Sequence, residues 1–197
     1  MPNRPHLDEP PLVRLPVVSV IGDARLDDPA AITQARATGA ALIEAGFRII
    51  TGGLGGVMEE VSHGARMSPS WSDGRIIGML PSYRAADANP WCDVVIPTGM
   101  QMGRNVLVVA AGDVVLAIGG GAGTLSEIAI AWQLGRPIVA LGSRGWAGRL
   151  AGEAVDGRSA EPIFAAHDIP SAIQRCRELA GRPRTGGDIG SGWRRGT

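Results

Sequence analysis

Short apolar runs alternate along the chain with longer stretches of helical spacing. Each run is rich in β-branched residues and almost continuously apolar, which is typical of a strand buried on both faces of a sheet. The apolar runs predict strands at 16–21, 47–51, 75–80, 93–96, 113–118 and 138–141. The intervening stretches predict helices at 28–45, 57–67, 99–111, 124–134 and 170–180.

Two of the predicted helices carry more detailed expectations. In the first, Asp28 followed by Pro29 is a start signal and Gly46 is a stop signal. In the helix at 99–111, one face is expected to be apolar. That face is formed by Met102, Val106, Val109 and Ala110.

The alternation of strands and helices predicts βαβ units, which build a parallel sheet covered on both faces. We therefore expect a single α/β domain at 16–180, with a Rossmann-like, doubly wound parallel sheet. Residues 1–15 are rich in proline and are expected to form a flexible arm, and 181–197 a flexible tail. Residues 143–169 give no clear pattern.

Composition excludes several kinds of chemistry. The chain has 197 residues with 19 basic and 19 acidic side chains, and every basic residue is arginine. Without lysine there is no Schiff-base lysine, no anchor for pyridoxal phosphate and no Walker-type phosphate loop. The balanced charge argues against nucleic acid and anionic membranes as partners. No apolar run has the length of a membrane span and no signal peptide is apparent, so a cytoplasmic protein is expected.

No metal site is expected from the metal-binding residue types. Cys92 and Cys176 do not form a C-x-x-C spacing, and the three histidines are dispersed. Glu59 and His63 are neighbours on a predicted helix, a pattern more typical of a solvated face than of a metal or acid–base site. Asp23 and Arg25 follow the first strand and either line a cleft or form an ordinary loop pair.

Three glycine-rich turns follow predicted strands, and the carboxyl ends of parallel strands share the edge of a sheet where ligands bind. In the third turn a strand leads through glycines into a helix, which places free N–H groups and the positive end of a helix dipole together. Missing β-carbons would let a phosphate approach, and the Thr124 hydroxyl can add a donor. The alternative is a connection chosen for tight helix–sheet packing. The turns supply Gly22, Asp23, Thr51, Gly52, Gly53, Gly56, Gly119, Gly120, Gly121, Ala122, Gly123 and Thr124.

Glu127 has two interpretations. The segment from Thr124 to Glu127 has the S/T-x-x-E spacing of a capping box, which stabilises a helix start by about 1 kcal/mol. Alternatively, Glu127 lies one turn into the helix and faces the group attached to the bound phosphate. A carboxylate there could orient a ribose, activate water or stabilise an oxocarbenium ion.

The segment 113–141 resembles the signature of the LOG superfamily. This group includes the "Lonely guy" phosphoribohydrolases, often misnamed lysine decarboxylases, and the molybdenum cofactor carrier proteins. The resemblance covers about residues 16–180, and Arg104 matches an essential arginine on the preceding helix. The turn from Thr51 resembles the family's second glycine-rich turn and extends to Val57 and Met58. The hydrolase pattern P-G-G-x-G-T-x-x-E is matched by Gly120, Gly121, Gly123, Thr124 and Glu127, with Gly119 in place of the proline.

The resemblance implies that Arg104 and Glu127 form a catalytic pair that cleaves the N-glycosidic bond of a nucleoside 5′-monophosphate. The products would be the free base and ribose 5-phosphate, with no required cofactor. Gly103 and Asn105 around Arg104 are closer to the molybdenum cofactor carrier branch, in which the cleft holds a phosphorylated pterin without chemistry. Enzyme and carrier both stay open, whereas decarboxylation by pyridoxal phosphate is excluded. The resemblance also implies a homodimer or larger homo-oligomer.

Overall fold

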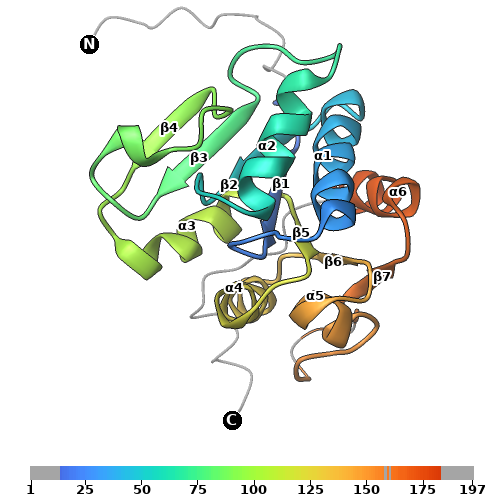
Figure 1. Ribbon diagram of the computed structural model, residues 1–197. Coiled ribbons are helices and arrows are strands. Elements are labelled where there is room, and N and C mark those ends of the chain that lie inside the picture. The colour runs from blue at the N-terminus through green and yellow to red at the C-terminus, as the bar shows by residue number, and fades with distance from the viewer. Residues whose placement is uncertain (1–13, 158, 160, 183–197) are drawn as a thin grey trace, which may run out of the picture.

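The computed structural model describes residues 14–157, 159 and 161–182. Within these ranges seven parallel strands form one sheet, in the order β4-β3-β2-β1-β5-β6-β7 (Figure 1). The strands are β1 (Val17–Gly22), β2 (Arg48–Thr51), β3 (Ile76–Leu80), β4 (Val94–Pro97), β5 (Val114–Ile118), β6 (Ile138–Leu141) and β7 (Phe164–Ala166). The predicted Rossmann-like parallel sheet is confirmed.

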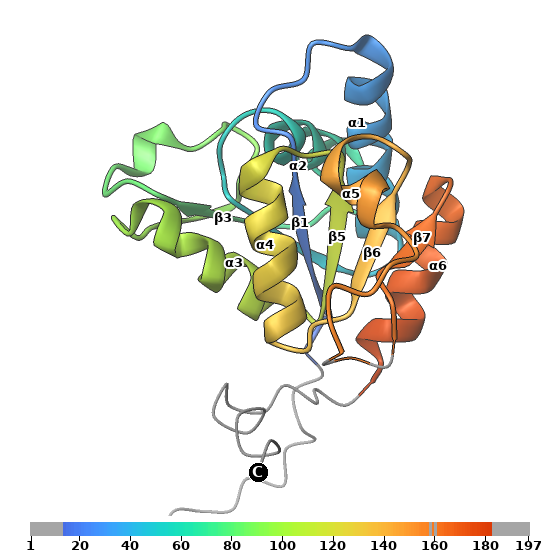
Figure 2. The same cartoon turned by 90° about the horizontal axis from the view of Figure 1, so that it is seen from below.

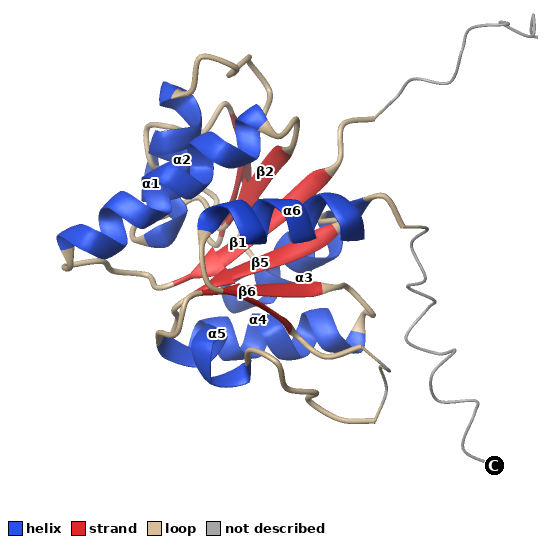
Figure 3. Cartoon of the chain, turned by 90° about the vertical axis from the view of Figure 1, so that its right-hand side faces the viewer, coloured by secondary structure: helices blue, strands red, loops and turns tan. Residues whose placement is uncertain are grey.

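The α-helices of the described ranges cover both faces of the sheet. Figure 2 and Figure 3 show α1, α2 and α6 on one face, and α3, α4 and α5 on the other. The helices are α1 (Pro29–Glu44), α2 (Val57–Met67), α3 (Arg104–Ala111), α4 (Ala122–Gln133), α5 (Gly145–Leu150) and α6 (Ile169–Ala180). Each face has its own buried apolar cluster, and β5 is buried along its whole length between them. None of these helices combines the length and the apolar character needed to cross a bilayer.

The strand order reverses beside β1, which pairs with both β2 and β5. Val18 lies opposite Ile49 of β2 and Val114 of β5. The chain leaves β1 toward α1 on one face and leaves β5 toward α4 on the other. In open α/β sheets this divergence leaves a crevice outside the carboxyl ends of the strands, which is where ligands bind.

Two buried charges hold strand ends in place. The Arg75 guanidinium donates to the carbonyl oxygen of Phe47 from Nε at 3.1 Å and from Nη2 at 2.6 Å, and to Ile43 at 3.0 Å. At the start of β5, the Asp113 carboxylate accepts from the Val17 amide at 2.8 Å. These contacts give the buried Phe47 carbonyl and Val17 amide their partners, while the Ile43 carbonyl also accepts from the Gly46 amide.

The sequence pattern misjudged the segment at 99–111. It contains a short 3₁₀ turn, η2 (Gln101–Gly103), before α3, so Met102 lies outside the α-helix and is 68% exposed. Val106 is 44% exposed. The predicted apolar face is therefore wrong at Met102 and Val106, because α3 turns Arg104 inward and the apolar residues at this end of the helix face outward, whereas Val109 is buried. The buried residues of α3 are Arg104, Asn105, Val108 and Val109.

The remaining boundaries differ from the prediction in limited ways. The segment 143–169, which had no assignment, holds α5 and β7. A second 3₁₀ turn, η1 (Ala85–Asp87), lies between β3 and β4. Residues 1–13 and 183–197 of the predicted arm and tail lie outside the described residues. Arg14, the first described residue, forms an ion pair with Asp113 at 2.6 Å.

Candidate functional site

The three glycine-rich turns meet at the carboxyl edge of the sheet, and the turn after β5 is the most constrained. Gly119 has φ +63° and Gly120 has φ +98°, a region that side chains disfavour. A β-carbon on Gly119 would collide with the Asp23 carboxylate, and one on Gly120 with the Thr124 side chain. The Gly119 and Gly120 carbonyls accept from the first turn of α5 at 3.0 and 2.9 Å. Glycine is therefore required at both positions for the loop to form.

The amino terminus of α4 is open to solvent. Gly121 is the N-cap residue, and no side chain caps the helix. A β-carbon on Gly121 or Gly123 would meet nothing within 4 Å, and Gly121 and Ala122 are exposed. The first N–H groups of the helix thus face space that an anion could occupy.

Thr124 and Glu127 do not form the capping box that their spacing suggested. The helix begins at Ala122, two residues earlier than predicted, so Thr124 lies inside the first turn. Its hydroxyl donates to the Gly22 carbonyl at 3.0 Å and joins the ends of β1 and β5. The capping-box interpretation is wrong, and Glu127 is directed to another partner.

That partner is Arg104, the first residue of α3. Its Nη1 lies 3.6 Å from Oε1 of Glu127, and each side chain is about 10% exposed. The guanidinium packs against Gly52 after β2, where a β-carbon would occupy its place. The Nε of Arg104 is buried and has no hydrogen-bond partner among the described residues. A buried donor without a partner is costly, so this N–H is a candidate contact for a bound molecule.

Burial perturbs both charges of this pair. Desolvation raises the pKa of Glu127 from its usual 4.5 to about 7, although the nearby Arg104 acts in the opposite direction. Desolvation likewise lowers the pKa of Arg104, against the attraction of Glu127. A carboxyl group with a pKa near neutrality can both accept and donate a proton at physiological pH. Strongly perturbed groups at a ligand-binding edge are typical of functional sites.

The turn after β2 supports the turn after β1. The Thr51 hydroxyl accepts from the Gly53 amide at 3.0 Å, and the Val57 amide donates to the Asp23 carbonyl at 2.8 Å. Gly53 and Gly56 have positive φ, and a β-carbon on Gly56 would collide with the same Asp23 carbonyl. Within this turn we therefore find packing roles for residues predicted to contact the ligand. Val57 is fully buried, and Met58 is 9% exposed.

The other chemically notable side chains lie away from the Arg104–Glu127 pair or make structural contacts. His63 stacks on Trp91, with ring centroids 4.0 Å apart, and Glu60 pairs with Arg36. Arg25 is exposed. Across the described ranges, no three His, Cys, Asp or Glu side chains gather into a possible metal site.

The chain matches the model of the SLOG cluster4 family over residues 15–169. It belongs to this family. The matched residues include all three glycine-rich turns, Arg104 and Glu127.

Solved structures similar to this SLOG cluster4 chain include two proteins named for the molybdenum cofactor. The molybdenum cofactor binding protein of Rippkaea orientalis is 29% identical with a TM-score of 0.73, covering 85% of this chain and 98% of that one. The molybdenum cofactor carrier protein of Chlamydomonas reinhardtii is 27% identical with a TM-score of 0.71, covering 85% and 99%. The protein TM1055 is 30% identical with a TM-score of 0.75, covering 84% and 100%. Together they confirm the resemblance to the LOG superfamily.

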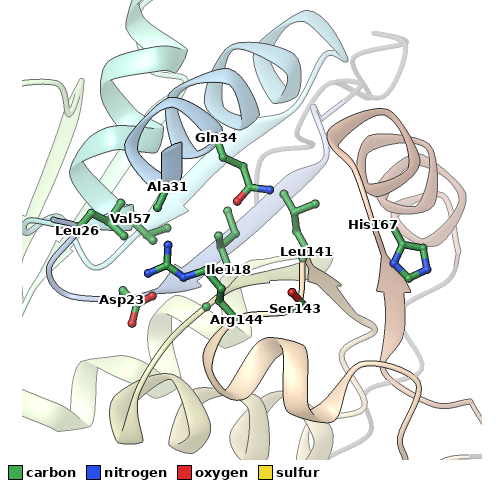
Figure 4. A pocket seen from close by; sticks show the side chains of 12 residues that line it. Asp23, Leu26, Ala31, Gln34, Val57, Ile118, Leu141, Ser143, Arg144 and His167 are labelled. Carbon is green, nitrogen blue, oxygen red and sulfur yellow. The ribbon is translucent and has the colours of Figure 1, made fainter. Parts of the chain in front are cut away.

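A pocket of about 300 Å³ adjoins the glycine loop of the SLOG cluster4 chain, on the α1 face (Figure 4). Sequence reasoning selected Asp23, Val57 and Gly119 of its lining but missed the residues from α1 and from the ends of β6 and β7. No motif marks these residues. Those after β6 and β7 fall at the end of a predicted strand or in the segment 143–169, which gave no clear pattern. The lining residues are Asp23, Leu26, Ala31, Gln34, Val57, Ile118, Gly119, Leu141, Gly142, Ser143, Arg144 and His167.

Proposed function

We propose that this protein binds a nucleoside 5′-monophosphate at the carboxyl edge of the sheet and hydrolyses its N-glycosidic bond. The observation that carries the proposal is the buried pair of Arg104 and Glu127, whose carboxyl pKa is raised to about 7. An ion pair with a purely structural role adds little stability when it is buried, because the cost of desolvating the two charges outweighs their attraction. A catalytic carboxyl group gains a pKa matched to the operating pH.

The phosphate would be held at the start of α4. Support comes from the missing side-chain cap, from the exposed N–H groups and from the open space beside Gly121 and Gly123. The helix dipole favours an anion at this end. Since the chain has no lysine, arginine and not lysine would supply a permanently charged phosphate donor beside the backbone amides.

The chemistry proposed for Glu127 is assistance of water attack at the ribose. Ionised Glu127 would stabilise the positive charge that develops on the sugar and accept a proton from the attacking water. The water oxygen bonds to C1′ while one water proton passes to Glu127, and the bond from C1′ to the base nitrogen breaks. The departing base nitrogen takes a proton from solvent, and Glu127 then returns its own proton to solvent. Arg104 would keep the carboxylate oriented, and its unpartnered Nε could donate to a ligand oxygen.

The test is release of free base from purified protein incubated with a panel of nucleoside 5′-monophosphates, followed by chromatography. We expect release by the native protein, at least ~100-fold slower release by Glu127→Gln, and similar ligand binding in both, because a lost general base costs this much. Glu153→Gln removes an exposed glutamate and serves as the matched control. Absence of release with every monophosphate tested would overturn the hydrolase proposal.

A second candidate is a carrier that binds the molybdenum cofactor without turnover. Two observations favour it: the names of two similar structures, and the Gly103 and Asn105 context of Arg104. The test is to purify the protein from cells that make the cofactor, and to assay for a fluorescent pterin after oxidation. Pterin retained by the native protein, together with no base release, would establish the carrier function instead.

We also propose that the protein self-associates through β4, η2 and α3. Here β4 is the edge strand, and large apolar side chains gather on its exposed surface and on the helix that follows. Exposed apolar patches beside an unpaired strand edge mark association surfaces. Sedimentation should detect a dimer, and Val106→Glu with Leu107→Glu should yield monomer; a native monomer at micromolar concentration would contradict this. The exposed residues are Val94, Ile96, Met100, Met102, Val106 and Leu107.

A further inference from the structure

The pocket on the α1 face combines buried aliphatic side chains with several polar ones. We propose that it binds a 2-amino-4-oxopyrimidine ring, the unit shared by guanine and pterin, through the carboxylate of Asp23. The inference rests on the proposed function only for the phosphate end of the ligand. Arg104 and Glu127 do not line this pocket, so ring binding is independent of the proposed hydrolysis. The two sites adjoin, because Gly119 lines the pocket and opens the loop that reaches α4 two residues later.

Five of the twelve residues that line the pocket are aliphatic. Val57, Ile118 and Leu141 are almost fully buried side chains that contribute to its lining, together with Leu26 and Ala31. The volume of about 300 Å³ lies at the lower end of ligand-binding pockets, which suits one ring system better than a whole dinucleotide. Apolar walls with a few polar groups at the rim are the usual arrangement around a heterocycle.

Asp23 supplies the polar group that would select the ring. Its side chain lies over Gly119 and takes part in no hydrogen bond or ion pair among the described residues. A carboxylate is a double acceptor and pairs best with two adjacent N–H donors. Guanine and pterin present such a pair, in the ring N–H and the neighbouring amino group. Adenine presents one amino group beside a ring acceptor, and hypoxanthine lacks the amino group.

A second polar group reaches the pocket from α1. Gln34 extends from the helix into the pocket (Figure 4), and its Nε2 lies 3.9 Å from where a β-carbon on Gly142 would stand. An amide N–H there could donate to the ring carbonyl, which lies beside the ring N–H in both guanine and pterin. The pocket therefore offers acceptors and a donor that match this ring.

The pocket is less suited to a phosphate than to a ring. Asp23 would repel an anion, and the Arg144 guanidinium at the rim is already paired with Asp28 at 2.8 Å. His167 is exposed at the end of β7. The charge of the ligand is better accommodated at α4, while the pocket receives its neutral ring.

The experiment compares guanosine, inosine and adenosine, none of which carries a phosphate, in titrations followed by nuclear magnetic resonance. Guanosine and unsubstituted pterin should bind at least ~10-fold more tightly than inosine and adenosine, because hydrogen bonds to a charged group contribute about 1.5–3 kcal/mol. Equal binding of guanosine and adenosine, or no binding of any ring, would overturn the assignment.

A specificity exchange separates recognition from a structural role of Asp23. In Asp23→Asn an amide donor replaces one carboxylate acceptor, so guanosine should lose its advantage and xanthosine, which has a carbonyl in place of the amino group, should gain one. Asp27→Asn makes the same charge change at an exposed position of the same loop and should keep the native preference. If the two variants behave alike, Asp23 does not read the ring.

Failure of the ring assignment and failure of the proposed function give different results. Adding the 5′-phosphate to guanosine should strengthen binding if α4 holds the phosphate. If guanosine 5′-monophosphate binds no better than guanosine, the phosphate site is wrong and the ring assignment stands. If all monophosphates bind equally well and better than their nucleosides, the ring assignment is wrong and the phosphate site stands.

Discussion

The raised pKa of Glu127 predicts a dependence of stability on pH that one substitution should remove. The carboxyl group has a pKa of about 7 in the folded protein against a usual 4.5, because the folded chain disfavours the ionised form. Between pH 4.5 and 7 the folded state holds a proton that the unfolded state has lost. The free energy of unfolding therefore falls as pH rises through this window, and the contribution of neutral Glu127 is lost above it.

The magnitude follows from the size of the shift. Each pKa unit corresponds to about 1.36 kcal/mol, so the change from 4.5 to about 7 corresponds to roughly 3 kcal/mol of stability between pH 4.5 and pH 8. The side chain introduced by Glu127→Gln is neutral at every pH, so the variant lacks this pH-dependent contribution to stability. It also leaves Arg104 without its counter-charge, but that effect does not vary with pH in this range. The difference between variant and native protein should therefore grow in favour of the variant as pH rises.

The assay is urea denaturation of both proteins at pH 5, 6, 7 and 8, with the two unfolding free energies subtracted at each pH. The slope of the difference reports Glu127 alone, since all other titrating groups cancel. Arg104→Gln should move the transition to higher pH, because the attraction that opposes the shift is removed. Glu153→Gln should give a flat difference. If the difference in unfolding free energy for Glu127→Gln does not change with pH, the inference that burial disfavours ionised Glu127 is refuted.

Three further substitutions test other parts of the structure. Gly123→Ala should raise the free energy of unfolding by up to about 1 kcal/mol, because it replaces a helical glycine facing open space, yet weaken phosphate binding in calorimetry. Asp113→Ala should lower stability by about 1–3 kcal/mol in urea denaturation, since it leaves the buried Val17 amide without its acceptor. Arg75→Met should lower the thermal midpoint by several degrees, because the Phe47 carbonyl loses two donors; an unchanged midpoint would contradict that role.

The sequence pattern was sufficient to locate the strands that are buried on both faces of the sheet. Strands such as β5 and β6 are apolar throughout because both faces are covered, so their positions follow from composition alone. The pattern failed at α3, where Arg104 is buried and Val106 exposed, because a charged side chain takes an inward position that periodicity gives to apolar residues. Local rules are expected to fail most often at such sites.

The candidate site was only partly predictable for a related reason. Arg104 was selected through resemblance and Glu127 already through its position one turn into the helix, while their contact depends on how α3 and α4 pack. The start of α4 could not be read from Thr124, because the chain satisfies its hydroxyl at Gly22, on another strand. Gln34 carries no motif, and it lines the pocket only because the fold brings α1 near Ile118 and Leu141 at the ends of β5 and β6.

The hydrogen bonds from α5 to the Gly119 and Gly120 carbonyls have an electrostatic consequence. Both peptide units are trans, so fixing their oxygen atoms on the α5 side turns the attached N–H groups away from that helix. The N–H groups of Gly120 and Gly121 therefore point away from α5 before any ligand binds. Attraction for negative oxygen atoms is in this way a property of the main chain itself, which substitution of surface side chains would leave in place.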